Sequence, residues 1–410
     1  MSPPVSPLPV SAMPVSSRLA LGFSCVGHTF SHLLMLLYPT VVLSLEGAWD
    51  MRFGELIALM LVGQILFGAA AVPAGWLADR WSAPGMMALF FLGTGGMCVA
   101  TGFADGPFAM AVGLGGIGLF ASIYHPVGIA WVTRDPATRG RALGINGVFG
   151  SLGTAGGAVV AGTLAATLGW QWAFFVPGAV CVLVGVGLVG SIMLGLVEDN
   201  RAVHHAAATE ASRGDMLRGA MVLMVTIALS GLIYQSTSFA MPKLFDQRLV
   251  GMVSTTAGVG LLVSLIYGVS ALAQVLGGWM ADRFDLKRVY ITCWALQIPF
   301  LAVAATLAGP LLLPVAAMMV LTNTAFVPAE NSLFARYSPP AWRGTAFGVK
   351  FLVSLGVSAI SVPLVGQLYD LAGDFEPLLV LLALFAAGGA IAGLLLPAGR
   401  RTEPVAQPAE

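Results

Sequence analysis

The chain has 410 residues, of which 58% are hydrophobic and 9% are charged, whereas soluble globular domains carry about a quarter charged residues. These proportions exclude an ordinary soluble protein and indicate an integral membrane protein. The 19 basic and 19 acidic residues balance to a net charge of zero, which removes any whole-chain electrostatic case for binding nucleic acid.

Twelve stretches are long and apolar enough to cross a bilayer, for which a helix needs about 20 residues. Residues 1–17, ahead of the first stretch, are rich in Pro and Ser and lack the basic start of a signal peptide, so we expect a disordered tail. In chain order the spans are expected at residues 18–44, 55–79, 84–104, 107–133, 141–168, 170–197, 218–245, 253–281, 286–308, 310–336, 344–370 and 375–397.

The basic residues orient these spans. With the N-terminus in the cytoplasm, 15 of the 19 Lys and Arg residues fall on the cytoplasmic side, and only Arg52, Lys243 and Arg248 fall on the opposite side. Cytoplasmic loops of membrane proteins carry an excess of Lys and Arg. We therefore expect a multi-pass protein of a bacterial inner membrane, monomeric, with both termini in the cytoplasm.

An internal repeat divides the chain into two halves. The seven residues GWLADRW that begin at Gly75 recur, 203 residues later, as GWMADRF from Gly278. The sequence thus predicts an all-α membrane fold with a six-helix bundle at 18–197, a cytoplasmic linker at 198–217, a second bundle at 218–397 and a tail at 398–410. An even number of spans separates the copies, so the halves are parallel. Two parallel six-helix halves are the architecture of the Major Facilitator Superfamily.

The repeated segment also carries a resemblance to that superfamily. It resembles the superfamily's signature between helices 2 and 3, together with the degenerate copy between helices 8 and 9. The residues that match are Gly75, Asp79 and Arg80 in the first copy and Gly278, Asp282 and Arg283 in the second. The resemblance covers nearly the whole chain and implies a secondary transporter that works by alternating access.

The signature implies an electrostatic latch at the cytoplasmic side. Asp79 would face the positive N-terminus of helix 11 near Arg343, where a carboxylate is favourable, and Arg80 would pair with a neighbouring acid. Such a contact would stabilise the outward-facing state. In the alternative reading, these residues only end a helix and satisfy the charge rule.

Polar side chains inside the spans are costly in lipid and usually face a cavity. The resemblance implies that helices 1, 4, 7 and 10 line that cavity. We therefore expect the pathway for substrate and protons to include His28, His32, Tyr124, His125, Asn146, Tyr234, Gln235, Asn323, Glu330, Asn331 and Lys350.

Glu330 and Lys350 are the carboxylate and the ammonium that lie well inside the spans. Glu330 precedes Arg336 by six residues, and Lys350 follows Arg343 by seven. With a helical rise of about 1.5 Å per residue, both lie about 9–11 Å inside the cytoplasmic boundary, so we expect a direct pair. Two readings stay open: a static salt bridge that fixes helices 10 and 11, or a pair that binds substrate or a proton.

The histidines form a second candidate centre. His28 and His32 share one face of helix 1, and His125 precedes Pro126, which can kink helix 4. Imidazoles suit proton relay near neutral pH. Each could instead be a neutral histidine bonded to a neighbouring helix, and His28, His32 and Met35 could present a soft-metal site, although we expect no resident metal.

A narrower resemblance concerns helices 1, 4 and 5. These helices are similar to the fosmidomycin-resistance branch of the superfamily, which exports drugs in exchange for protons. Two positions depart from its pattern: Thr154 stands where the antiporter signature has proline, and Val127 stands where drug-efflux members often have an acid. The segments that carry the similarity are Ser31-His32, Tyr38-Pro39, Tyr124-His125-Pro126, Arg139-Gly140-Arg141-Ala142 and the glycines Gly147, Gly150, Gly153, Gly156 and Gly157.

These features predict a secondary transporter that exports a small organic solute, a drug or a metabolite, with the proton gradient as its energy source and without a cofactor. Import of a metabolite or a metal is an alternative, and a membrane scaffold or sensor that transports nothing is another. The sequence has no GxxxxGK[ST] loop, which disfavours ATP-driven pumping. It also lacks a metal-ligand cluster or a nucleophile motif, so we expect no enzymatic activity.

Overall fold

The computed structural model describes residues 14–132, 139–199, 212–339 and 343–397, and these residues are almost entirely α-helical. The helices of the first half are α1 (Val15–Trp49), α2 (Phe53–Ala58), α3 (Leu61–Ala69), α4 (Ala71–Arg80), α5 (Ala83–Gly102), α6 (Pro107–Ala121), α7 (Tyr124–Val132), α8 (Arg139–Leu168) and α9 (Trp172–Met193). Those of the second half are α10 (Arg213–Arg248), α11 (Thr256–Arg283), α12 (Leu286–Thr306), α13 (Leu312–Ala325), α14 (Val327–Tyr337), α15 (Arg343–Gly356), α16 (Ser358–Ala372) and α17 (Glu376–Leu394).

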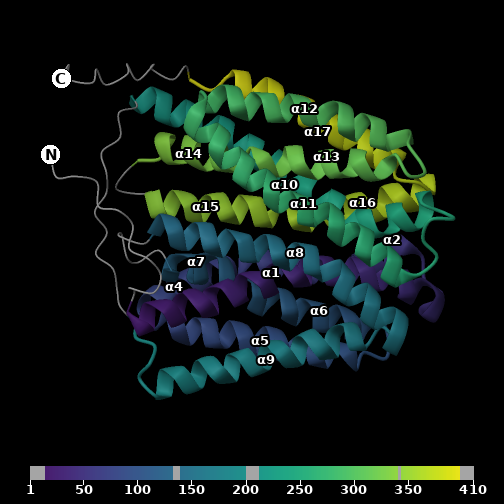
Figure 1. The fold of residues 1–410 in the computed structure, drawn as a ribbon, viewed down its shortest axis with the longest axis horizontal. Helices are drawn as coiled ribbons and strands as arrows, with labels where there is room; N and C mark the ends of the chain where they lie inside the picture. Colours follow the sequence, from purple (N-terminus) through teal and green to yellow (C-terminus); the bar gives the residue numbers. More distant parts are fainter. Residues whose placement is uncertain (1–13, 133–138, 200–211, 340–342, 398–410) are drawn as a thin grey trace.

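The two halves form two bundles that lie side by side, the first below the second in Figure 1. Twelve helical stretches among the described residues are long and apolar enough to span a membrane, which confirms the predicted number. α1 begins and α17 ends at the same end of the helices, here called the terminal end. The opposite end, where α1 ends at Trp49, is called the distal end.

Four of the twelve spans are interrupted, and a proline lies just after the break in the fourth and in the tenth. The fourth span changes from α6 to α7 four residues before Pro126, and the tenth changes from α13 to α14 just before Pro328. A proline lacks a backbone donor and its ring clashes with the carbonyl of residue i−4. The helix is therefore interrupted just before Pro126, where a kink was expected, and the second half has a similar interruption before Pro328.

Matching caps begin the third span of each half. Ser82 Oγ accepts the Gly85 amide at 3.1 Å at the start of α5, and Asp285 Oδ1 accepts the Arg288 amide at 3.0 Å at the start of α12. A side-chain acceptor at this position satisfies an amide that the first helical turn leaves free. Each cap begins its helix just after the repeated motif, at the terminal end.

Several boundaries differ from the predicted ones. α1 begins at Val15 and runs to Trp49, so the first span is longer than 18–44 at both ends. α10 begins at Arg213, where Ser212 Oγ accepts the Asp215 amide at 3.1 Å, so the predicted linker at 198–217 ends five residues too late. Residues 1–13, 200–211 and 398–410 of the predicted tails and linker lie outside the described residues.

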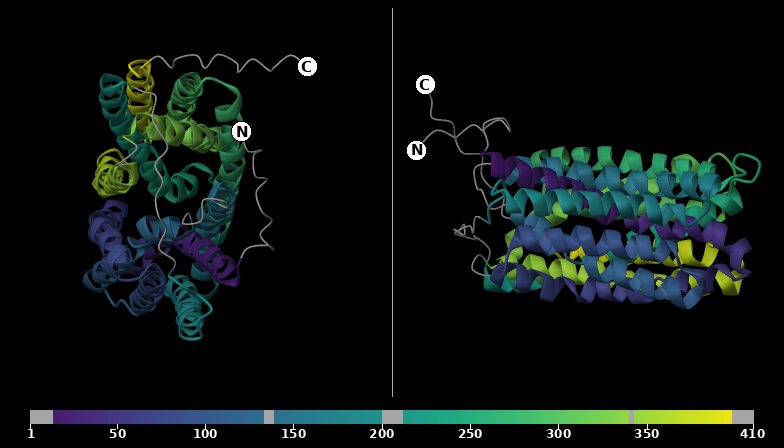
Figure 2. Two further views of the ribbon diagram at one scale, coloured as in Figure 1. Left: turned by 90° about the vertical axis from the view of Figure 1, so that its left-hand side faces the viewer. Right: turned by 90° about the horizontal axis from the view of Figure 1, so that it is seen from below.

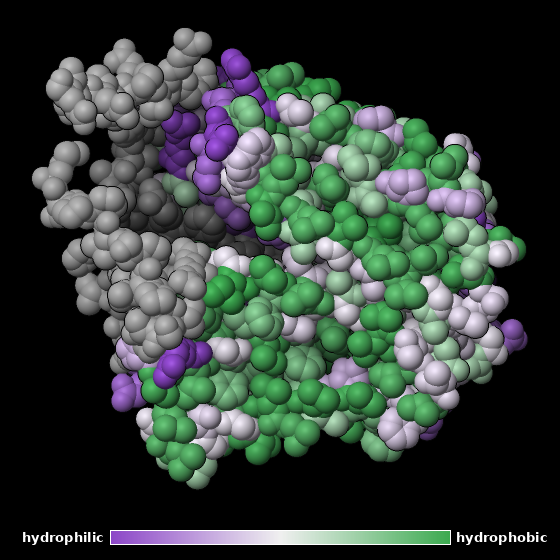
Figure 3. Space-filling view, in the orientation of Figure 1, coloured by the Kyte–Doolittle hydropathy of each residue, from purple (hydrophilic) through white to green (hydrophobic). Residues whose placement is uncertain are grey.

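The surface suits a lipid environment. Figure 3 shows apolar side chains covering the middle of the molecule, with hydrophilic residues gathered toward the ends of the helices. Exposed apolar side chains on this surface include Val72, Leu183, Leu272 and Leu384. In water such a surface would aggregate, whereas in a bilayer it is the solvated face.

The two bundles meet closely at the distal end. Lys243 of α10 pairs with Glu46 of α1, with Nζ 2.7 Å from Oε2. The Gly54 amide of α2 donates to Asp370 Oδ1 of α16 at 3.0 Å, and the Arg52 guanidinium lies 3.8 Å from the same carboxylate. We call this set of contacts the distal seal.

Figure 2 gives an end-on view of the terminal end, with one bundle above the other. The distal seal closes the opposite end of the structure.

Candidate functional site

The second bundle contains a buried ion pair. Lys350 Nζ of α15 lies 2.9 Å from Glu330 Oε1 of α14, and the two side chains are 6% and 5% exposed. The predicted pairing is confirmed. Removing one partner of such a pair leaves an uncompensated buried charge and is strongly unfavourable, so the two charges depend on each other.

Neighbouring helices complete the bonding of this pair. Lys350 Nζ also donates to Asn331 Oδ1 at 2.5 Å and lies 5.8 Å from the centre of the Phe334 ring. On the other side, the Tyr290 hydroxyl of α12 lies 3.2 Å from Glu330 Oε2. Both carboxylate oxygens and the ammonium thus have fixed partners, which holds the pair in one geometry.

Tyr290 and its partner Thr226 of α10 were missed by the sequence analysis. The Tyr290 hydroxyl lies 2.7 Å from Thr226 Oγ1, and both residues are fully buried. Tyr290 lies seven residues after Arg283, which places it at a depth similar to that of Glu330. The depth of the ion pair was predicted by counting residues from the arginines at the span ends. The same count, applied to residues that carry a hydroxyl group, would have identified Tyr290.

The first bundle brings together the three predicted histidines. The ring centres of His28 and His32 are 4.8 Å apart, and His125 of α7 lies 5.8 Å from the first and 5.5 Å from the second. Phe67 covers His125 at 6.1 Å. Among the described residues, no group of three or more His, Cys, Asp or Glu side chains is arranged to hold a metal ion.

Asn146 of α8 ties this histidine cluster to the helices around it. Its backbone oxygen lies 2.7 Å from His28 Nδ1, and its Oδ1 accepts the Tyr124 hydroxyl at 3.0 Å. Its Nδ2 donates to Ser24 Oγ at 3.2 Å, and that hydroxyl in turn donates to the Gly128 carbonyl at 3.0 Å. Three of the predicted residues, His28, Tyr124 and Asn146, therefore form one bonded unit with Ser24 that joins α1, α7 and α8.

The other predicted residues lie apart from both centres. Tyr234 lies beside Thr154 of the first bundle, and its ring lies 6.1 Å from that of Tyr267. Asn323 is buried in α13, and no described residue bonds its Nδ2. Gln235 also lies at the contact between the bundles, since it lines a cavity whose other walls belong to the first bundle.

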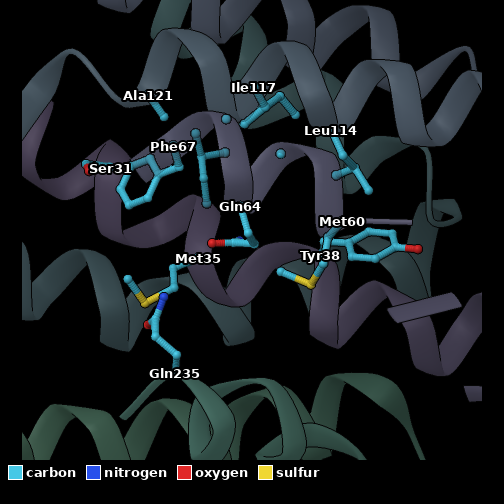
Figure 4. A pocket seen from close by; sticks show the side chains of 13 residues that line it. Ser31, Met35, Tyr38, Met60, Gln64, Phe67, Leu114, Ile117, Ala121 and Gln235 are labelled. Atoms are coloured by element: carbon cyan, nitrogen blue, oxygen red, sulfur yellow. The ribbon is translucent and has the colours of Figure 1, made fainter. Parts of the chain in front are cut away.

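This cavity lies between α1, α3, α6 and α10 (Figure 4). Its volume is about 60 Å³, enough for about two water molecules. Apolar side chains form most of its wall, including Met35, Met60 and Phe67. Ser31 Oγ and Gln235 Oε1 also belong to lining residues and have no hydrogen-bond partner among the described residues.

The repeated motif lies at the terminal end of each bundle. Asp79 and Asp282 are exposed there, and neither pairs with a described basic residue. In place of the acid that we expected beside Arg80, its guanidinium carbon lies 4.2 Å from the centre of the Trp76 ring, a cation–π contact on its own helix. The second copy repeats this contact, with Arg283 5.3 Å from the Trp279 ring.

The glycines of the motif have different surroundings. A Cβ on Gly75 would meet Pro126 of α7 at 3.3 Å, whereas a Cβ on Gly278 would meet no atom within 4 Å. α4 does contact α15 at the terminal end. The side chain of Arg343 lies outside the described residues, so the latch from Asp79 to helix 11 stays a prediction.

The comparisons with known proteins agree with this architecture. A family model described as the Major Facilitator Superfamily matches residues 19–259 and 250–410. A solved structure of a bacterial homolog of the human lysosomal transporter Spinster, in an inward-facing and occupied conformation, is 15% identical with a TM-score of 0.72 and covers 94% of this chain and 95% of that one. At that identity the likeness shows the fold.

Curated relatives match over shorter segments. The chain is 33% identical over 172 residues to a protein of Cupriavidus necator named "Probable sulfoacetate transporter", over 40% of this chain and 37% of that protein. It is 28% identical over 126 residues to a puromycin resistance protein of Streptomyces alboniger, over 30% of this chain and 25% of that protein. The chain thus matches less than half the length of either relative. With the family model matching nearly its whole length, the chain belongs to the Major Facilitator Superfamily.

Proposed function

We propose that the chain transports a small organic anion together with a proton. The observation that supports this most strongly is the buried pair of Lys350 and Glu330, whose charges sum to zero. Protonation of Glu330 would leave the Lys350 ammonium without its counter-ion, so the site would become positive. An anion would then bind more tightly than before, which is the differential affinity that coupling requires.

Whether proton binding strengthens or weakens substrate binding determines the direction in which the proton gradient drives transport. Export in exchange for protons, our expectation from the sequence, needs proton binding to weaken substrate binding. At this pair proton binding would strengthen the binding of an anion, so proton and anion would move together. The pair therefore favours the importer alternative, driven by the proton gradient.

The choice of an anion rests on Lys350 and on one relative. Asn331 Oδ1 holds the Lys350 ammonium at 2.5 Å, so the cation keeps its position when Glu330 is neutral. The name of the Cupriavidus relative gives sulfoacetate as its substrate, and sulfoacetate carries a sulfonate and a carboxylate. A small sulfonate or carboxylate is the substrate class that we propose.

The membrane setting follows from the charge rule. Cytoplasmic loops carry the excess of Lys and Arg, and the terminal end carries most of these residues here, so we place it in the cytoplasm of a bacterial inner membrane. The distal seal then closes the external side. The structure would be the inward-facing state, and the distal seal must break for the outward-facing state to form.

Drug export is a second candidate, and a different observation favours it. The cavity beside α10 has an apolar wall that includes Met35, Met60 and Phe67, which an apolar solute would contact once the cavity widens in another state of the transport cycle, and one relative is named for puromycin resistance. In this case the histidine cluster would take the proton, and the bound proton would disfavour a cationic drug nearby.

Proteoliposomes with a trapped pH dye separate these proposals. Sulfoacetate is added outside first, followed by a panel of other small sulfonates and carboxylates. Co-transport predicts that entry of the anion acidifies the lumen, whereas exchange with protons predicts that it becomes alkaline. If no anion of the panel enters the vesicles, the proposed substrate class is wrong, and puromycin becomes the probe for the second candidate.

A further inference from the structure

A row of buried oxygen atoms extends from Glu330 into the second bundle. The Tyr290 hydroxyl lies 3.2 Å from Glu330 Oε2 and 2.7 Å from Thr226 Oγ1. Thr226 Oγ1 lies in turn 3.1 Å from the Val222 carbonyl oxygen and 3.0 Å from that of Leu223. Tyr290 and Thr226 are fully buried and Glu330 is 4% exposed, so the row must satisfy its own hydrogen bonds.

Each hydroxyl of this row has one hydrogen to donate. When Glu330 is ionised, Tyr290 donates to its carboxylate and Thr226 can donate to the Tyr290 oxygen. When Glu330 carries a proton on Oε2, it donates to the Tyr290 oxygen, Tyr290 donates to Thr226, and Thr226 donates to its own helix. Rotation of two hydroxyls converts one arrangement into the other with the heavy atoms in place, and every hydrogen stays bonded in both.

The contacts of the carboxyl group select Oε2 as the atom that takes the proton. Oε1 faces the Lys350 ammonium at 2.9 Å, a group that has only hydrogens to donate. The helices packed against α14 are α10, α11, α12 and α13. Of the described residues on them, Tyr290 is the titratable side chain that bonds Glu330, and Lys350 reaches it from α15. The oxygen of Tyr290 is therefore the acceptor for a proton on Glu330.

We propose that Tyr290 and Thr226 are positioning residues that allow Glu330 to exist in both protonation states. This inference rests on the proposed function, because it concerns the protonated form of Glu330 that the proposed transport cycle requires. It assigns the stability of that form to two buried hydroxyl groups. The proton goes to Oε2, no bond between heavy atoms changes, and the Lys350 ammonium still donates to Asn331 and to the now uncharged Oε1. The two hydroxyls then help to set the pH at which Glu330 becomes neutral.

The two residues should act in opposite directions. In Thr226→Val, protonated Glu330 would leave the Tyr290 hydrogen without an acceptor, whereas the ionised form keeps its bond from Tyr290. An unsatisfied buried donor is costly, so the midpoint of protonation should fall by about one pH unit. In Tyr290→Phe, the ionised form loses a charge-assisted bond, the stronger of the two kinds, and the midpoint should rise.

An infrared titration of the purified protein measures this midpoint without any substrate. The carbonyl stretch of a protonated carboxyl group is followed against pH, and the band of Glu330 is the one that Glu330→Gln removes. Matched controls lie in the same bundle. Tyr267→Phe removes a buried hydroxyl that bonds Ser238 at 2.8 Å, and Thr322→Val removes one whose bonds within the described part of the chain go to carbonyls of its own helix. Neither control should move the band.

The outcomes distinguish this inference from the proposed function. If no band disappears in Glu330→Gln, Glu330 does not take the proton and the proposed function fails. If the band is present but Thr226→Val and Tyr290→Phe leave its midpoint unmoved, or shift it in the same direction, the inference is wrong while proton binding stands. Should Tyr290→Phe fail to fold, Thr226→Val alone decides, because a midpoint that does not fall contradicts the inference.

Discussion

Replacing Gly54 with alanine should open the distal end. A Cβ on Gly54 would lie 2.5 Å from Asp370 Oδ2 and 2.7 Å from the Gly366 carbonyl oxygen. The carboxylate could rotate, but the backbone oxygen can move only with its helix, so α2 and α16 must separate. Overpacking of this kind costs about 1–3 kcal/mol. Because the distal-closed state alone bears this cost, the equilibrium should shift about 5- to 150-fold toward the distal-open state.

Spin labels placed on the distal surface would report this shift. Phe108 at the start of α6 and Leu371 near the end of α16 are 83% and 85% exposed, and they belong to different bundles. Cysteine variants at both positions can be labelled, because the native cysteines are buried. Double electron–electron resonance should show a longer distance gaining population in Gly54→Ala.

The control is Gly47→Ala, which adds the same methyl group near the distal end of α1, where it would meet no atom within 4 Å. It should leave the distance distribution unchanged. If Gly54→Ala gives the distribution of the wild type and of this control, the close approach of α2 and α16 does not hold the distal end closed.

Two further variants test other contacts. Lys243→Met should also raise the distal-open population, because it leaves Glu46 without the ammonium that now lies 2.7 Å away. Adding Glu46→Gln to this variant should reverse part of the change, and the same spin labels measure both variants. Asn146→Ala removes the acceptor of the Tyr124 hydroxyl and should lower stability by about 1–3 kcal/mol, read as a lower melting temperature in detergent. Ser332→Ala, at an exposed hydroxyl that bonds its own helix, should not lower it; equal melting temperatures for the two variants would contradict the assigned role.

Features that repeat along the chain could be predicted from the sequence. The recurrence of the Gly75 segment at Gly278 fixed the two halves, and the run lengths between charges fixed twelve spans. The pairing of Glu330 with Lys350 was also predictable, because consecutive spans joined by a short loop place residues at equal depths beside each other. Depth along a helix follows directly from counting residues.

Features that depend on how helices face one another could not be predicted. Tyr290 precedes Glu330 by 40 residues in the sequence and bonds it from another helix. Asp370 accepts a hydrogen bond from the Gly54 amide, which lies 316 residues away in the sequence and in the other bundle. A tyrosine or an aspartate near a span end has many possible roles, and periodicity does not say which neighbour its face will meet. The cation–π contact of Arg80 with Trp76 is local, yet the family pattern directed attention to an acidic partner instead.

The central claim is that Glu330 carries the proton that moves with the anion. Its most direct test is the proteoliposome assay repeated with Glu330→Gln, which mimics the neutral acid, and with Glu376→Gln, the same change at an exposed position. We predict that the anion still enters through Glu330→Gln vesicles but no longer acidifies the lumen, whereas Glu376→Gln behaves as the wild type. Acidification of the lumen by Glu330→Gln at the wild-type ratio of protons to anions would contradict the account.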